Sequence, residues 1–205
     1  MIRDAMRLLG AGAALSLAAC ASAPLHYYTL VAPASTTASG SALTTSAPPF
    51  ELLPVSVPAA VDQPQLVVRE GAQAMAVLGS ERWVAPLGDE VRSALSADLA
   101  RDLHSQDVDG LPDNDKPRFR ITLDVRRFDS QPGSYALIEG SWSIRLLHGD
   151  HPAALACNSR IRETVGQGYA ALVQGHQQAI GQLAQQIATA ARALGDGQAA
   201  SCPAD

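Results

Sequence analysis

The middle of the chain constrains the fold most, because three strand-like stretches follow one another with only short turns between them. From Phe119 to Arg126 apolar and polar residues alternate, which is the pattern of a strand buried on one face. Residues 135–147 and 153–165 also have strand character, and turn residues at 130–133 and 148–151 separate the three segments. Consecutive strands with short turns form an antiparallel meander. The sequence therefore predicts an antiparallel sheet at the centre of the fold.

Two segments have helical periodicity instead. Apolar residues recur every four positions from Leu87 to Leu103, directly after Pro86, a residue that suits the start of a helix. A second apolar stripe runs over 169–194 and ends at Gly195. Further short strands are predicted at 26–31, 50–57, 65–69, 74–78 and 82–84, with a turn at Gly79-Ser80 before the last of them. The predicted fold class is α+β: a largely antiparallel sheet with two amphipathic helices packed on one face.

The first twenty residues have the layout of an export signal. Arg3 and Arg7 precede a run of small and apolar residues, Leu8 to Ala19, that is shorter than the roughly 20 needed to span a bilayer. Leu17-Ala18-Ala19-Cys20 closes this run and resembles the lipobox of bacterial lipoproteins, which are cut before the cysteine and acylated on it. The resemblance implies removal of residues 1–19 and a lipid anchor on Cys20. An ordinary export signal with a chance cysteine is the alternative.

The rest of the chain is predicted to form one domain. A lipidated tether at 20–26 precedes a single α+β domain at 27–195, and residues 196–205 form a C-terminal tail. Every residue of 32–49 except Leu43 is Ala, Ser, Thr, Gly or Pro. Such a segment cannot bury enough apolar surface to offset its ordering entropy, so we expect a disordered loop there.

Two cysteines remain once Cys20 is acylated. An exported protein enters an oxidising compartment, where paired thiols tend to form disulfides. We therefore expect Cys157 and Cys202 to be bonded, which would fix the tail to the third strand of the meander. Two free thiols, or a bond between chains, remain open at this point.

Charge and motifs indicate a protein without an obvious catalytic centre. The net charge is −5 and Lys116 is the only lysine, so nothing in the composition indicates a nucleic-acid partner. The sequence contains no P-loop, no Gly-x-Ser-x-Gly motif and no paired-cysteine metal motif. No metal or cofactor is expected.

Several polar residues are candidates for a functional site. His148 and His151, with Asp150 between them, could form a surface metal site, but a solvated hairpin tip is favoured. His176 lies on the apolar stripe of the last helix and is expected in the core or at its edge. The remaining candidates are Asp124 and Asp129, which have no evident partner base, and Arg126-Arg127, which could contact lipid phosphate but are better explained as a solvated strand edge.

The order of several weak motifs resembles a known family. These are Tyr27-Tyr28-Thr29-Leu30, Val55-Ser56-Val57-Pro58, Arg82 to Leu87, Ile121 to Asp129, and Ile138 to Trp142. Together they resemble the ABC-type transport auxiliary lipoproteins of the PqiC type, over nearly all of the mature chain. The motif residues with expected structural roles are Tyr27, Tyr28, Leu30, Trp83, Pro86, Leu87 and Trp142. We expect Leu87 to pack on the sheet and Trp83 to be buried; an exposed Trp83 that anchors a partner is the alternative.

The resemblance implies a role beside MCE-type lipid transporters. Such systems combine an inner-membrane component with an MCE-domain protein that bridges the periplasm. The lipoprotein would be the non-catalytic docking subunit at the outer membrane, and Ala21 after the lipid cysteine fits outer-membrane sorting. A lipid- or peptidoglycan-binding lipoprotein unrelated to MCE systems is the main alternative. A hydrolase is a third, and would require a cleft with a nucleophile–base pair; a homo-oligomer remains open.

Overall fold

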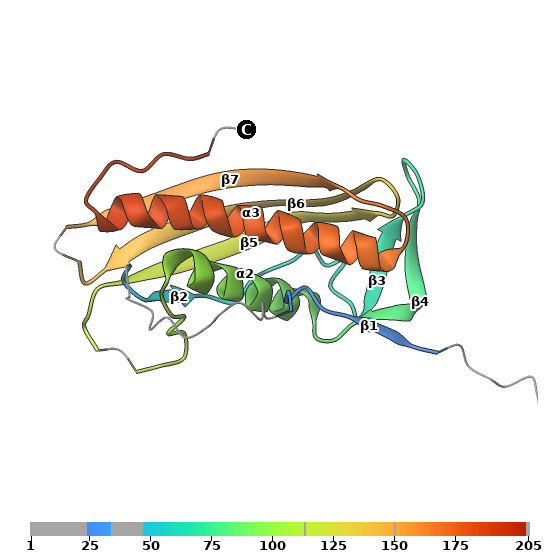
Figure 1. Cartoon of the computed structure of the whole chain (residues 1–205), viewed down its shortest axis with the longest axis horizontal. Coiled ribbons are helices and arrows are strands. Elements are labelled where there is room, and N and C mark those ends of the chain that lie inside the picture. The colour runs from blue at the N-terminus through green and yellow to red at the C-terminus, as the bar shows by residue number, and fades with distance from the viewer. Residues whose placement is uncertain (1–23, 34–46, 113, 150, 204–205) are drawn as a thin grey trace, which may run out of the picture.

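The computed structural model describes residues 24–33, 47–112, 114–149 and 151–203. The export signal, Cys20 and most of the predicted loop at 32–49 lie outside these residues. The described chain contains two helices and seven strands (Figure 1). In chain order they are β1 (His26–Tyr28), β2 (Phe50–Leu52), β3 (Gln65–Arg69), β4 (Met75–Trp83), α2 (Leu87–Leu103), β5 (Arg118–Gln131), β6 (Tyr135–Leu147), β7 (Ala153–Thr164) and α3 (Tyr169–Gly195).

The predicted meander forms the central sheet, in the order β2-β5-β6-β7. β5, β6 and β7 are antiparallel, and β2 adds a short parallel strand beside β5. The register places Leu123, Trp142 and Cys157 in one row, and all three are buried. One face of this sheet therefore supplies much of the core, as the alternating pattern predicts.

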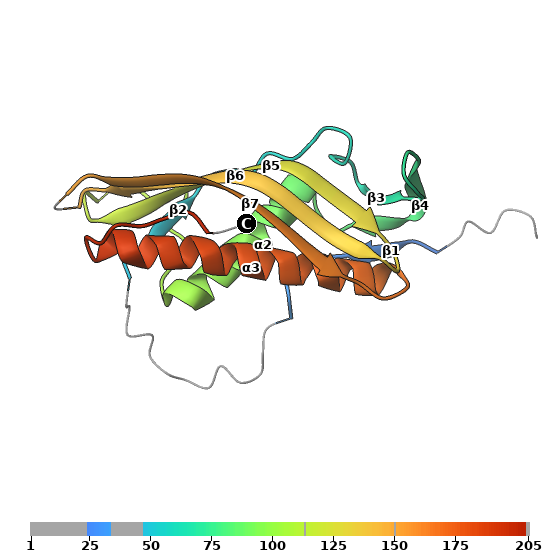
Figure 2. The same cartoon turned by 90° about the horizontal axis from the view of Figure 1, so that it is seen from above.

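Both helices lie on that face, side by side (Figure 2). α3 packs along β6 and β7, and α2 packs against α3. The four-residue spacing along α2 buries its apolar stripe completely, from Leu87 to Leu103. The predicted α+β class is confirmed, and so is the placement of two helices over one face of the sheet.

A second, smaller sheet differs from the prediction. β1, β4 and β3 form a separate three-stranded sheet in which β1 runs parallel to β4. The predicted turn at Gly79-Ser80 is wrong, because β4 continues from Met75 to Trp83 without interruption. In place of a turn, the pairing of β4 with β3 has a register shift, since Gln65 pairs with Arg82 but Val67 pairs with Val77. Gly79 and Ser80 lie within this shift, between the segment of β4 that pairs with β3 at 75–77 and the segment that pairs with β1 at 81–83, so pairing on either side of the dipeptide holds β4 extended across it.

Two predicted strands are shorter than expected. β1 ends at Tyr28, and Leu30 follows in a bend. β2 ends at Leu52, after which Ser56 makes only an isolated parallel bridge to Asp124. Pro54 lacks a backbone N–H, which accounts for the early end of β2. Among the described residues, no helix is long and apolar enough to cross a membrane.

Candidate functional site

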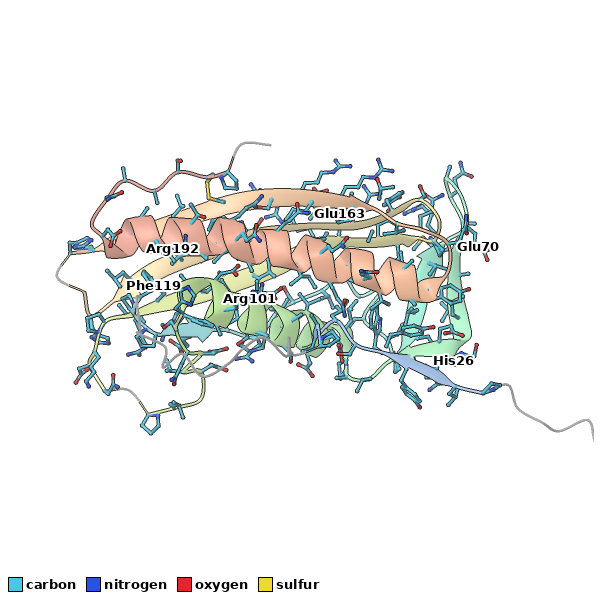
Figure 3. The ribbon with its side chains drawn as sticks, viewed as in Figure 1. His26, Glu70, Arg101, Phe119, Glu163 and Arg192 are labelled. Carbon is cyan, nitrogen blue, oxygen red and sulfur yellow. A yellow bond between two sulfur atoms is a disulfide. The ribbon has the colours of Figure 1, made fainter. Side chains whose placement is uncertain are left out.

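The start of the described chain is held to the body by a buried carboxylate. Glu81, on β4, accepts a hydrogen bond from the Tyr28 hydroxyl at 2.7 Å and pairs with His26 Nδ1 at 2.9 Å. These hydrogen bonds, first that of His26 and then that of Tyr28, lower the pKa of Glu81. Burial, and then the contact with Glu81, raises the pKa of Tyr28 to about 12. Glu81 is therefore an ionised acceptor that fixes β1 in place, close to the labelled His26 of Figure 3.

A second carboxylate holds the next two residues. Glu90 lies in the first turn of α2 and is almost completely buried. Its Oε2 accepts hydrogen bonds from the Leu30 amide at 2.7 Å and from the Thr29 hydroxyl at 2.8 Å. Leu30 itself is buried in the core. We call Tyr28, Thr29, Leu30, Glu81 and Glu90 the N-terminal clasp.

Several family-motif residues lie near the clasp, at the end of β4 and the start of α2. Trp83 is 5% exposed and meets Phe128 edge to face, with ring centroids 6.2 Å apart. Leu87 is fully buried at the start of α2, and the carbonyl of Pro86 accepts the Asp89 and Glu90 amides. The structure therefore places Trp83 and Leu87 in the core, as expected, together with Trp142, whose indole N–H donates to Ser159. A pocket of about 380 Å³ opens beside Trp83, lined also by residues 62–64 and 84–86.

Exposed apolar side chains gather around the same end of the molecule. Tyr27 is 59% exposed on β1, Val77 is 55% exposed on β4, and Val84 is 64% exposed just after β4. Leu25, Val31 and Met75 are also exposed, so six of the seven large apolar side chains that are exposed in the described residues belong to β1, β4 and their flanks. Only Leu111 lies elsewhere among them. A cluster of this kind is a candidate contact surface.

Among the described residues, a serine–histidine pair lies inside the core. Ser130 Oγ is 2.8 Å from His176 Nε2, and both residues are buried beneath α3. His176 also stacks on Phe128, with ring centroids 3.9 Å apart, and its Nδ1 has no hydrogen-bond partner. Burial lowers the pKa of His176 to about 3. The pair has no solvent access and no group orienting the base, so its role is structural, as expected for a histidine on the apolar stripe.

Asp129, next to Ser130, points to the opposite face of β5. There it accepts hydrogen bonds from Arg69 at 2.9 Å, Arg127 at 2.7 Å and Tyr135 at 3.1 Å. Burial alone would raise the pKa of Asp129, but the bonds from Arg69 and Arg127 outweigh it and lower the pKa. This buried ion pair ties β3 to β5. Sequence reasoning missed it because its partners are 60 residues apart.

The other polar candidates are dispersed. Among the described residues no group of three or more His, Cys, Asp or Glu could hold a metal ion. His151 contacts the Leu194 carbonyl at 3.3 Å, and Asp150 lies outside the described residues. Asp124 accepts a hydrogen bond from Ser56, and Arg126 lies 3.8 Å from Asp124 on the exposed face of the sheet.

A disulfide joins Cys157 on β7 to Cys202 in the tail, with a Cα–Cα distance of 5.4 Å (the yellow bond in Figure 3). The structure thus joins the two cysteines for which the sequence favours a bond. The tail returns alongside α3, and the two enclose a groove of about 760 Å³. Gln182, Gln186 and Ala190 line its helix side, and residues 199–203 line the other side.

Comparison with known proteins identifies the family. The model of the ABC-type transport auxiliary lipoprotein component matches residues 28–188. This range contains β2 to β7, both halves of the clasp and nearly all of the core. The chain therefore belongs to the ABC-type transport auxiliary lipoprotein component family, and the resemblance seen in the motifs is confirmed. At this level the family indicates a membrane-attached lipoprotein that associates with a transport system.

Solved structures share the fold at low sequence identity. The crystal structure of an uncharacterized protein is similar with a TM-score of 0.62 and 18% identity, over 82% of this chain and 98% of that one. A crystal structure of a protein from Xanthomonas campestris has a TM-score of 0.54 and 18% identity, over 81% of this chain and 93% of that one. A search of curated proteins gave no significant match.

Proposed function

We propose that the protein is an outer-membrane lipoprotein, anchored through Cys20, that serves as a non-catalytic docking subunit of an MCE-type lipid transport system. The family match over residues 28–188 carries this proposal. In it the partners are an MCE-domain protein that bridges the periplasm and an inner-membrane transport component.

The N-terminal clasp supports a fixed position at the membrane. Glu81 and Glu90 hold residues 26–30 to the body through buried or half-buried hydrogen bonds. Only residues 21–25 then separate Cys20 from His26, and the six Cα–Cα steps between these two residues span at most ~20 Å when extended. The body would stay against the membrane and present a fixed socket to a bridging partner.

Capture of the lipidated protein from its own cells tests the partner assignment. The chain would carry an affinity tag after Asp205, be cross-linked in intact cells, extracted with detergent and analysed by mass spectrometry. An MCE-domain protein among the captured proteins is the expected result. Capture of peptidoglycan fragments or lipid without any MCE component would favour the alternative binding module.

The socket has a separate test in amide hydrogen exchange. Glu90→Gln removes the charged acceptor of the Leu30 amide, and a hydrogen bond to a charged group contributes about 1.5–3 kcal/mol. Exchange of the Leu30 amide should then accelerate by about thirty-fold. Asp89→Asn is the matched control, because Asp89 is an exposed acid in the same helical turn. Fast exchange of the Leu30 amide in the parent protein would contradict the socket.

A further inference from the structure

The small sheet has one face in the core and one face toward solvent. Its register places Tyr27, Arg82 and Gln65 in one row across β1, β4 and β3, and Val77 opposite Val67 in the next. Tyr27 and Val77 are more than half exposed, and Val84 continues this face beyond the end of β4. The neighbouring residues Glu81 and Trp83 are buried toward the opposite side, as strand alternation requires. We call Tyr27, Val77, Arg82 and Val84 the outer patch.

Arg82 is the cation at the centre of this patch, and it has no anionic partner among the described residues. Its Nε is buried and has no hydrogen-bond partner. The acid beside it in sequence, Glu81, is engaged by His26 and Tyr28 on the other face. The Arg82 Nε has almost no solvent-exposed surface, so an external anion would contact the two terminal nitrogens of the guanidinium.

The position of the patch in the chain indicates where that anion comes from. Tyr27 lies seven residues after Cys20, and the clasp fixes it to the body. An exposed tyrosine, aliphatic side chains and an arginine are the combination found at membrane–water interfaces, where aromatic and apolar groups enter the headgroup region and the cation meets phosphate.

We propose that the outer patch rests on the phospholipid bilayer, with Arg82 bound to a lipid headgroup phosphate and Tyr27 and Val84 in the interfacial layer. This inference rests on the proposed anchoring at Cys20 and adds a lipid-contact site on the folded body. The contact would orient the body on the membrane, with β1, β3 and β4 facing the lipid and the far end of α3 extending away from them (Figure 1).

Vesicle co-sedimentation of the mature chain, residues 20–205 with Cys20→Ser, tests this without an acyl anchor. The vesicles contain phosphatidylethanolamine and phosphatidylglycerol. The parent should partition onto them, and Arg82→Gln should lower the partition coefficient about five-fold, the effect of one arginine near an anionic surface. Tyr27→Ser with Val84→Ser should lower it about ten-fold through the lost apolar contact. Unchanged melting temperatures would show that each variant is folded.

Arg160→Gln is the matched control, because Arg160 is an exposed strand arginine on β7, outside the patch. It should leave partitioning unchanged. No binding by the folded parent, or an equal loss with Arg160→Gln, would overturn the proposal. Two other outcomes with unchanged vesicle binding would also overturn it. In the first, the patch substitutions dissociate a homo-oligomer; in the second, they abolish capture of an MCE-domain protein. Failure here leaves the capture experiment on the lipidated protein unaffected, so the two proposals can fail separately.

Discussion

Burial of His176 predicts a loss of stability in mild acid. The side chain is 1% exposed, bonded to Ser130 and stacked on Phe128. Burial lowers its pKa from 6.5 to about 3, against a small opposing effect of Asp129. In the unfolded chain the same group titrates near 6.5, so between these values the unfolded state binds a proton that the folded state does not.

The sign and size follow from this difference. The contribution of neutral His176 to the free energy of unfolding is complete above about pH 6.5 and is lost as the pH falls toward 3. Between pH 7.5 and pH 5.0 the free energy of unfolding should fall by about 2 kcal/mol from His176 alone. Glu81 and Asp129 have lowered pKa values, so their own contributions are lost only at lower pH.

Urea unfolding at the two pH values measures the effect. His176→Gln keeps a hydrogen-bonding group near Ser130 but cannot titrate, so its free energy of unfolding should change little between pH 7.5 and pH 5.0. His151→Gln is the control, because His151 lies in a loop and should retain the parent slope. If His176→Gln loses as much stability in acid as the parent, the buried imidazole is not the source of the effect.

Three further outcomes are expected. Cys20→Ala should remove the protein from the outer-membrane fraction; unchanged fractionation would mean that another anchor exists. Trp83→Ala should destabilise the fold by about 3–5 kcal/mol, measured as a lower melting temperature, because it empties a core position; a melting temperature equal to that of the parent would instead indicate a surface role. The Cys157–Cys202 bond closes a loop over a separation of 45 residues, so its removal by Cys202→Ser should cost about 4 kcal/mol in the chain-entropy model. Two reactive thiols in the exported, unreduced parent would contradict that bond.

The elements with strong periodicity could be predicted from the sequence. The alternation of apolar and polar residues from Phe119 continues over many residues, and the apolar stripe from Leu87 continues over several helical turns. The local residue pattern alone therefore defines this strand and this helix. The disulfide was expected from the export signal and the cysteine count. In each case one physical requirement, burial of one face or oxidation of a thiol pair, is expressed directly in residue type and spacing.

The sheet arrangement depends on contacts that no local pattern encodes. β1 pairs with residues of β4 that lie 55 positions further along the chain, and β4 stays extended through Gly79-Ser80 within a separate sheet. The clasp is similar, since Glu90 reads as a favourable first-turn acid until its distant partners, Thr29 and Leu30, are known. The hydrogen-bond partner of a buried polar residue cannot be predicted from the local sequence when that partner is distant in the chain.

The clasp also sets an order of events during biogenesis. Leu30 and Glu90 are 60 residues apart, so their bond cannot form until α2 has emerged from the export machinery. Contacts between distant segments form late, because the loop between them must close first. In the proposed lipoprotein, the acylating enzyme and the signal peptidase would therefore act before the clasp closes, and closure would afterwards bring the folded body close to the membrane. The length of chain between the anchor and the folded body would therefore decrease only after the anchor is in place.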